Sequence, residues 1–146
     1  MKIFLGSDHA GFKFKEKIKK VLDKKNISYE DCGTYSENPC DYPDYAFLVG
    51  KHVAQTPDSK GILVCGTGAG MCIAANKVEG IRAAEAHDVY TAKMSREHND
   101  SNILCLQARK VKFTETERIV STWLKTKFSK EVRHLRRVQK ISAYEY

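Results

Sequence analysis

Residues 61–70 read GILVCGTGAG, and this stretch indicates how the chain folds. Its first half, 61–65, is an uninterrupted apolar run of strand length, which is typical of a strand buried on both faces. Its second half contains three glycines in five residues and leads into the helix-compatible run MCIAANK at 71–77. The stretch therefore predicts a strand, a tight glycine turn and a helix in succession, which is a unit of an α/β fold.

The same alternation continues on both sides of this unit. Further apolar segments of strand length lie at 2–7, 27–31, 81–86 and 103–106. Helical spacing predicts five more helices. One begins at Gly11, the next has Asp44 as its N-terminal cap, and the others cover 87–96, 114–128 and 131–146. Residues 33–43, with two prolines, read as a loop. We therefore expect one domain over 1–146, an α/β three-layer sandwich with a five-stranded parallel sheet.

Composition limits the class of protein. The chain has 146 residues, of which 42% are hydrophobic and 29% charged, so a packed core is expected. No apolar run approaches the ~20 residues of a membrane span, and the N-terminus does not resemble a signal peptide. The five cysteines are odd in number and form no CxxC pair, which argues against a disulfide framework and a zinc finger. These features predict a cytoplasmic protein without membrane association.

The net charge of +7 is confined to one end of the chain. Residues 1–106 contain equal numbers of basic and acidic side chains, whereas 107–146 contain 11 basic and 4 acidic ones. A basic end is compatible with nucleic acid, with a small phosphorylated ligand, or with a solvated helix face. No nucleic-acid-binding motif accompanies it, so we expect no nucleic-acid partner.

The glycine loop at 66–70 has the chemistry of an anion cradle. Its glycines let the backbone turn tightly and aim consecutive N–H groups at one point, next to a helix N-terminus. It lacks the Gly-Lys-Ser/Thr ending of a P-loop and the spacing of a dinucleotide fingerprint. A purely structural turn is the alternative.

Cys65 ends the strand at the mouth of this loop. Convergent N–H groups favour a thiolate there, and the same groups stabilise a developing oxyanion. Together they would supply the base and the electrophile that an enediolate intermediate needs. The alternative is an ordinary buried cysteine.

Other reactive groups cluster at predicted strand ends or in the basic tail. Because ligands of parallel sheets bind at the carboxyl ends of strands, we single out the ends at 7–9, at 65–67 and the stretch just before 102–103. His98 is suited to proton transfer near neutral pH. Arg133 and Arg137 lie four residues apart and would share a helix face that suits a phosphate. For each of these, an ordinary turn or solvated surface is the alternative.

Five stretches together resemble the ribose-5-phosphate isomerase B family, which includes the galactose-6-phosphate isomerase subunits. They are GSDHAGF (6–12), CDYPDYA (40–46), GILVCGTGAGMCIAANKVEGIRAA (61–84), SREHNDSNIL (95–104) and RHLRRV (133–138). They span nearly the whole chain in the same order. The resemblance implies a Rossmann-like fold and a homodimer, with a tetramer of paired dimers as the alternative. It also implies active sites at the subunit interface and a C-terminal helix used in dimerisation.

The resemblance also implies roles for individual residues. Cys65 matches the proton-abstracting base, Thr67 a hydroxyl that handles protons on the sugar oxygens, and His98 the residue that opens the furanose ring. The substrate-binding positions that it implies are Asp8, His9, Asp41, Tyr42, Gly66, Gly68, Ala69, Gly70, Asn99, Arg109, Arg133 and Arg137. No metal and no cofactor is implied.

The implied reaction interconverts ribose 5-phosphate and ribulose 5-phosphate through a cis-enediolate, a step of the non-oxidative pentose phosphate pathway. One alternative is a hexose-phosphate isomerase of the same family, acting on galactose 6-phosphate or allose 6-phosphate. Another is a catalytically silent sugar-phosphate sensor.

Overall fold

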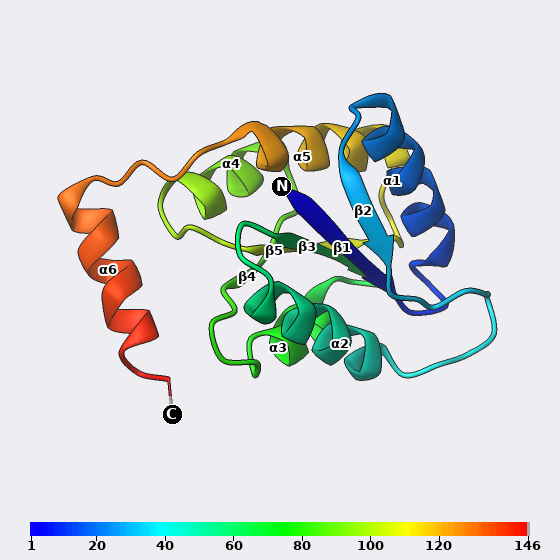
Figure 1. Cartoon of the computed structure of the whole chain (residues 1–146). Helices are drawn as coiled ribbons and strands as arrows, with labels where there is room; N and C mark the ends of the chain where they lie inside the picture. The colour runs from blue at the N-terminus through cyan, green and yellow to red at the C-terminus, as the bar shows by residue number, and fades with distance from the viewer. Residues whose placement is uncertain (146) are drawn as a thin grey trace.

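A computed structural model, which describes residues 1–145, contains five strands in one parallel sheet (Figure 1). The strands are β1 (Lys2–Ser7), β2 (Ser28–Asp31), β3 (Lys60–Cys65), β4 (Ala83–Glu85) and β5 (Ile103–Gln107). Their spatial order is β2-β1-β3-β5-β4, and every neighbouring pair is parallel. The α/β class and the five-stranded parallel sheet are thus confirmed.

Six helices connect or follow the strands. They are α1 (Phe12–Lys24), α2 (Tyr42–Gln55), α3 (Ala69–Ala75), α4 (Val89–Glu97), α5 (Phe113–Lys125) and α6 (Val132–Ser142). Helices α1, α4 and α5 cover one face of the sheet, and α2 and α3 cover the other (Figure 1). This arrangement produces the three layers that the alternation of strands and helices predicted.

Two hydrophobic cores follow from the period-2 alternation of the strands. In β3, Ile62 and Val64 face α1, α4 and α5, whereas Leu63 and Cys65 face α2 and α3. The first core is centred on Trp123, which is fully buried and donates a hydrogen bond from Nε1 to Ser101 Oγ at 2.9 Å. Because both faces of the sheet are covered, its strands are continuously apolar, as the sequence indicated.

Several boundaries differ from the predicted ones. Helix α2 begins at Tyr42 after an N-cap residue at Asp41, so the predicted cap, Asp44, lies inside the first turn. Proline is favoured in that first turn because its missing N–H has no helical partner there. Strand β4 is shorter than predicted, and α5 ends at Lys125. The predicted C-terminal helix covers Val132–Ser142, and Tyr146 lies outside the described residues.

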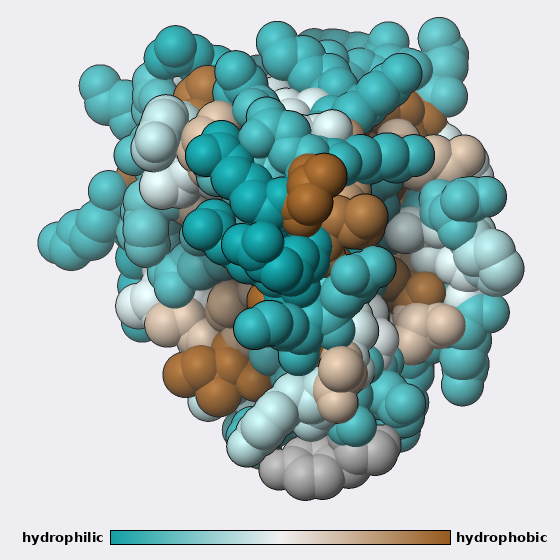
Figure 2. Space-filling view, turned by 90° about the vertical axis from the view of Figure 1, so that its left-hand side faces the viewer, coloured by the Kyte–Doolittle hydropathy of each residue, from teal (hydrophilic) through white to brown (hydrophobic). Residues whose placement is uncertain are grey.

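Helix α6 stands apart from the sheet, on the side where β1 begins (Figure 1). Of its predicted apolar face, Val138 is buried, but Val132, Leu135 and Ile141 are 80%, 41% and 49% exposed. Figure 2 views this side and shows separate apolar patches among hydrophilic side chains. Most of the apolar face of α6 is therefore not covered by the rest of the described chain. Within residues 1–145, no helix has the length and hydrophobicity required to cross a bilayer.

Candidate active site

At one place in the sheet the chain leaves two neighbouring strands, β1 and β3, toward opposite edges. From β1 the chain moves outward to β2, and it then returns to β3 on the other side of β1. In open parallel sheets such a switch point leaves a crevice at the carboxyl ends of the two strands. Asp8 and His9 follow β1 at this point, and residues 66–70 follow β3.

The glycine loop forms a cradle around the Cys65 thiol. Cys65 is 4% exposed, and the Gly68 N–H donates a hydrogen bond to its Sγ at 3.1 Å. Gly68 has a φ of +86°, which favours glycine, and a Cβ there would lie 3.1 Å from the Leu106 carbonyl carbon. Thr67 is exposed at the tip, and its Oγ1 accepts a hydrogen bond from the Ala69 N–H at 3.4 Å. An N–H group of the loop therefore points directly at the sulfur.

Asp8 and His9 are held by backbone groups beside this loop. Asp8 is buried, and its Oδ1 accepts a hydrogen bond from the Gly11 N–H at 3.0 Å, just ahead of α1. The Cys40 N–H donates to His9 Nδ1 at 3.2 Å. Because Nδ1 is an acceptor, a neutral His9 carries its proton on Nε2. His9 therefore bonds the loop 33–41 through one nitrogen and has a donor on the other.

Tyr42 and Arg109 close the two ends of the cradle. A Cβ at Gly70 would lie 2.7 Å from the Tyr42 ring, and one at Gly66 would lie 3.2 Å from the Arg109 guanidinium. The Arg109 N–H also donates to the Gly66 carbonyl at 3.1 Å. Both side chains are exposed, as is Asp41 beside Tyr42. These predicted residues therefore lie together with Cys65.

Sequence reasoning did not place Glu85 at this edge. Its Oε1 would be 3.2 Å from a Cβ at Gly68, and it lies 3.3 Å from His87 Nε2. His87 was expected to be a structural or surface residue, and it is exposed. Its position near the end of the predicted strand at 81–86 is the signal in the sequence that could have drawn attention to it.

His98 and Asn99 lie at the opposite edge of the sheet. They follow α4, which runs back from the end of β4 to the start of β5. Cys65 pairs in register with Gln107, the last residue of β5, so the length of β5, about 13 Å, separates the two sites. The stretch before residue 103 was expected among the ligand-binding strand ends. That expectation is wrong, because the stretch precedes β5 and so lies at the amino end of that strand, not at a carboxyl end.

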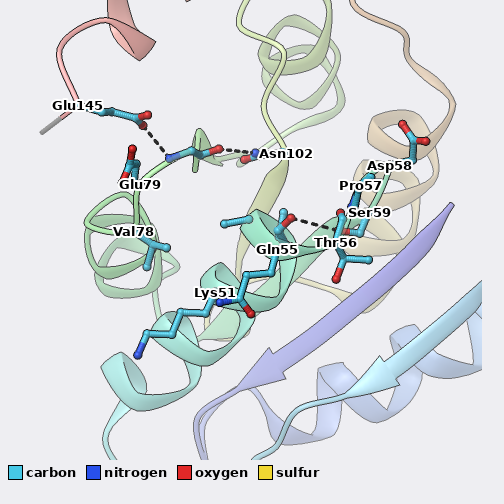
Figure 3. A pocket seen from close by; sticks show the side chains of 13 residues that line it. Lys51, Gln55, Thr56, Pro57, Asp58, Ser59, Val78, Glu79, Asn102 and Glu145 are labelled. Atoms are coloured by element: carbon cyan, nitrogen blue, oxygen red, sulfur yellow. Dashed lines mark hydrogen bonds between the residues drawn. The ribbon is translucent and has the colours of Figure 1, made fainter.

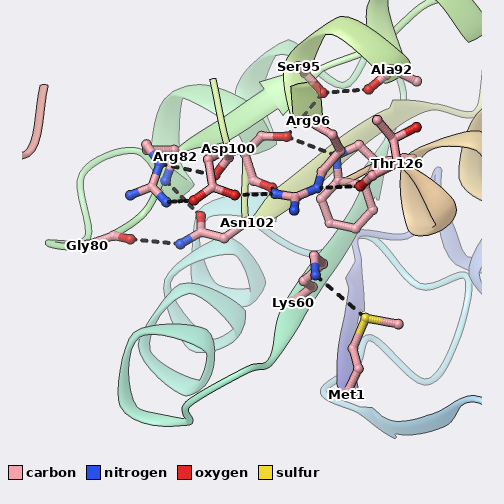
Figure 4. Close-up of polar contacts among 12 residues, drawn as sticks. Met1, Lys60, Gly80, Arg82, Ala92, Ser95, Arg96, Asp100, Asn102 and Thr126 are labelled. Carbon is pink, nitrogen blue, oxygen red and sulfur yellow. Dashed lines mark hydrogen bonds and ion pairs between the residues drawn. The ribbon is translucent and has the colours of Figure 1, made fainter. Parts of the chain in front are cut away.

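Buried ionic contacts fix the turn that carries His98 (Figure 4). Arg96 is 7% exposed and donates from Nη1 to Asp100 Oδ1 at 2.9 Å, so these two residues bracket His98 and Asn99. Arg82 also binds Asp100, with Nη2 3.2 Å from Oδ2. Arg96 Nε donates to the Thr126 carbonyl at 3.3 Å, which ties the turn to the chain that leads to α6.

Helix α6 is joined to this turn through a second histidine. The rings of His98 and His134 lie 4.2 Å apart between centroids, and His134 Nδ1 is 2.7 Å from Ser129 Oγ. Burial lowers the pKa of His134, and the proximity of His98 and Arg133 lowers it further. Arg133 is exposed and pairs with Glu131 at 3.0 Å, and Arg137 is exposed on the same helix. The predicted residues therefore form two groups at opposite edges of one chain.

Two other features lie away from both groups. A surface hollow of about 710 Å³ lies near the end of α2, between residues 51–59, 78–80, Asn102 and Glu145 (Figure 3). Its lining contains no predicted site residue. Glu30, Cys32 and His52 have metal-ligand chemistry and lie within 4.8 Å of one another. Lys2 already pairs with Glu30 at 2.6 Å, and burial raises the pKa of Cys32 to about 11.

Comparison with known proteins shows the family of the chain. The family model described as Ribose/Galactose Isomerase matches residues 3–141. The chain belongs to this isomerase family. The family assignment confirms the resemblance seen in the five sequence stretches, which include the cradle and the turn at His98.

Individual members of the ribose/galactose isomerase family are similar over almost their whole length. A solved structure of ribose-5-phosphate isomerase B from Clostridium thermocellum has 47% identity and a TM-score of 0.96, over 99% of this chain and 97% of that one. The Mycoplasma genitalium ribose-5-phosphate isomerase B, solved with bound ribulose-5-phosphate, has 44% identity and a TM-score of 0.94, over 99% and 95%. The Escherichia coli ribose-5-phosphate isomerase B is 42% identical over 99% of this chain and 96% of its own.

Proposed function

We propose that this chain interconverts ribose 5-phosphate and ribulose 5-phosphate, with Cys65 as the base. The observation that carries the proposal is the buried thiol that accepts the Gly68 N–H at 3.1 Å beside a loop of further amides. Proton abstraction next to a carbonyl needs a base and donors for the enediolate oxygen at one point. The M. genitalium relative with bound ribulose-5-phosphate supports this substrate class.

In the proposed mechanism, the Cys65 thiolate removes the proton from C2 and returns it to C1 of the open-chain sugar. The amides of residues 66–70 stabilise the oxyanion of the cis-enediolate, and Thr67 transfers protons between the sugar oxygens. Asp8, His9, Asp41 and Tyr42 would contact the substrate around the cradle. The mechanism invokes no metal or cofactor.

The phosphate end and the ring-opening step use the remaining predicted residues. His98 would assist opening of the furanose, with Asn99 contacting the sugar. Arg109, Arg133 and Arg137 would hold the phosphate, because forked guanidiniums suit its oxygens. Binding of this non-reacting end orients the carbon atoms at the base.

We further propose that each active site combines residues of two copies of the chain. Cys65 and His98 lie at opposite edges of one chain, so a single copy does not bring both to one sugar. Helix α6 stands off the body with Val132, Leu135 and Ile141 exposed, which suits an apolar interface with a second copy. A homodimer, alone or paired into a tetramer, would join the two groups of residues.

A coupled assay tests the reaction directly. The purified protein is given ribose 5-phosphate, galactose 6-phosphate and allose 6-phosphate in parallel, without added metal. We expect turnover of ribose 5-phosphate. The hexose phosphates are included because the family model is described by both ribose and galactose. Turnover of a hexose phosphate alone would keep the mechanism and replace the substrate, and no turnover of any sugar would contradict the proposal.

The place of this reaction in the cell remains a prediction. A role in the non-oxidative pentose phosphate pathway, in the cytoplasm, would follow from the substrate. Deletion of the gene followed by measurement of ribose and ribulose phosphate levels would test it. Unchanged levels of both sugars, in cells without another such isomerase, would contradict the pathway assignment.

A further inference from the structure

Three of the five cysteines meet on one face of the sheet beneath α3. Cys65 ends β3, Cys105 lies in β5, and Cys72 lies in the first turn of α3. The register pairs Leu63 with Cys105, so Cys65 is the next residue of β3 on the same face. Cys65 and Cys105 are buried, whereas Cys72 is partly exposed. Of these three, Cys72 alone is open to a reagent from solvent without movement of the core.

Polar groups surround the sulfur of Cys72. It packs against the buried cluster that contains Cys105, whose thiol is its ionisable neighbour. Asn76 Nδ2 donates to it at 3.6 Å, and the thiol can itself donate to the Ala83 carbonyl at 3.4 Å. The two sulfurs are thus direct neighbours on different elements, a helix and a central strand.

These neighbours decide which of the two thiols ionises. The neighbouring Cys105 thiol and the Glu85 N–H lower the pKa of Cys72 to about 7, against the effects of burial and the Glu85 carboxylate. Complete burial raises the pKa of Cys105. Near neutral pH the pair therefore consists of a Cys72 thiolate and a protonated Cys105, and the thiolate is the form that reacts with oxidants.

We propose that Cys72 is a site of oxidation by peroxides, with Cys105 as the thiol that resolves the product to a disulfide. In the first step the Cys72 sulfur attacks one peroxide oxygen and the O–O bond breaks. This step gives a sulfenic acid and hydroxide, which becomes water. In the second step the Cys105 sulfur bonds to Cys72, the S–O bond breaks, and the oxygen leaves as water with the thiol proton. Two thiols are oxidised, and one hydrogen peroxide is reduced to two waters.

The cross-link would reach the cradle because α3 begins there. The Cys72 N–H donates to the Gly68 carbonyl at 3.1 Å, and Gly68 in turn donates to Cys65. A disulfide holds its sulfurs about 2.05 Å apart, closer than two unbonded thiols, so it draws the first turn of α3 toward β5. We expect this movement to shift the amides of 66–70 and to suppress turnover until a reductant is added. This consequence for activity rests on the proposed function, whereas the disulfide does not.

Mass spectrometry of the wild-type protein tests the chemistry. The reduced protein is treated with hydrogen peroxide at pH 7.5, blocked with N-ethylmaleimide and digested with trypsin without reductant. The expected product links peptide 61–77 to peptide 97–109, which carries Cys105. Because Cys65 and Cys72 share the first peptide, fragment ions must place the link at Cys72. A link at Cys65, or no link between these peptides, would overturn the proposal.

Variants then separate this site from oxidation of Cys65. In Cys72→Ser we expect the disulfide to disappear and inactivation by peroxide to slow about tenfold, because the partly exposed thiolate that reacts first is gone. In Cys105→Ala, dimedone should trap a sulfenic acid at Cys72. The matched control, Cys32→Ser, should be inactivated as fast as wild type. Equal inactivation rates for Cys72→Ser and wild type would contradict the proposed effect on activity. The peptide analysis tests whether the disulfide forms even if the protein has no isomerase activity.

Discussion

The cradle edge, formed by Asp8, His9, residues 65–70 and Arg109, differs in construction from the turn at His98. The cradle edge is held by the ends of two central strands, and its thiol is 4% exposed. The turn at His98 is held by Arg96 and Asp100 and by one ring contact with α6. The sheet alone can position the cradle edge. The other group also depends on where α6 lies, and thus, in the proposed dimer, on a second chain.

Removal of the thiol should produce the largest effect. We expect Cys65→Ala to lower kcat by about 10³-fold or more, because the base is lost while the amides remain. The unfolding temperature should stay close to that of wild type, since only one sulfur leaves the core. The coupled assay and a thermal melt measure the two quantities. Activity above about a hundredth of wild type would show that another group is the base.

Complementation would test whether the two groups act in one active site. Cys65→Ala and His98→Ala are each expected to be impaired, and co-refolding them in equal amounts should restore about a quarter of wild-type activity. This fraction follows if half the dimers are mixed and each mixed dimer has one intact site. Co-refolding Cys65→Ala with the double variant is the control. No recovery would mean that both residues act within one chain, whereas full activity of His98→Ala alone would mean that His98 has no role.

A change on α6 should affect binding more than turnover. Arg137→Ala should raise KM for the sugar phosphate about tenfold with a smaller change in kcat, because a phosphate contact is lost away from the reacting carbons. Arg136→Ala is the matched control, since its side chain points about 100° around the same helix. Equal effects of the two substitutions would indicate a general electrostatic contribution of the basic helix.

The smallest expected effect concerns pH. The pKa of His134 is lower in the folded chain than in the unfolded one, so its neutral form is favoured by folding. Its contribution to stability is therefore complete above about pH 6.5 and is lost as the pH falls through the lowered value. Thermal melts between pH 7.5 and pH 5 should show a steeper loss for wild type than for His134→Gln. Parallel curves would contradict this assignment, and the exposed His87→Gln should follow wild type.

The sequence predicted the cradle edge well because local signals and sheet geometry coincide there. An apolar run ending at Cys65 and a glycine turn leave few alternatives to a strand followed by a tight loop, and strand ends of a parallel sheet meet at one edge. The start of α2 was missed because Pro43 reads as a loop residue, although proline is also favoured in a first helical turn.

The turn at His98 and α6 were harder to predict, for physical reasons. His98 was assigned by proximity to a strand, but the edge it occupies depends on the direction in which α4 returns. The spacing of Val132, Leu135 and Ile141 predicts an apolar helix face, yet periodicity does not say whether the same chain covers it. The contact between His98 and His134 joins segments 36 residues apart and has no local pattern.

The packing around the cradle glycines limits how this active site can vary in evolution. A side chain at Gly66 would meet Arg109, one at Gly70 would meet the Tyr42 ring, and Gly68 is held in a left-handed conformation against Leu106. Gly68 resists replacement most strongly because backbone atoms surround it, so the part of the proposed site around the reacting carbons has little freedom to diverge. Divergence in sugar preference would then have to arise on the opposite wall, where the exposed side chains of α6 can change without disturbing the sheet.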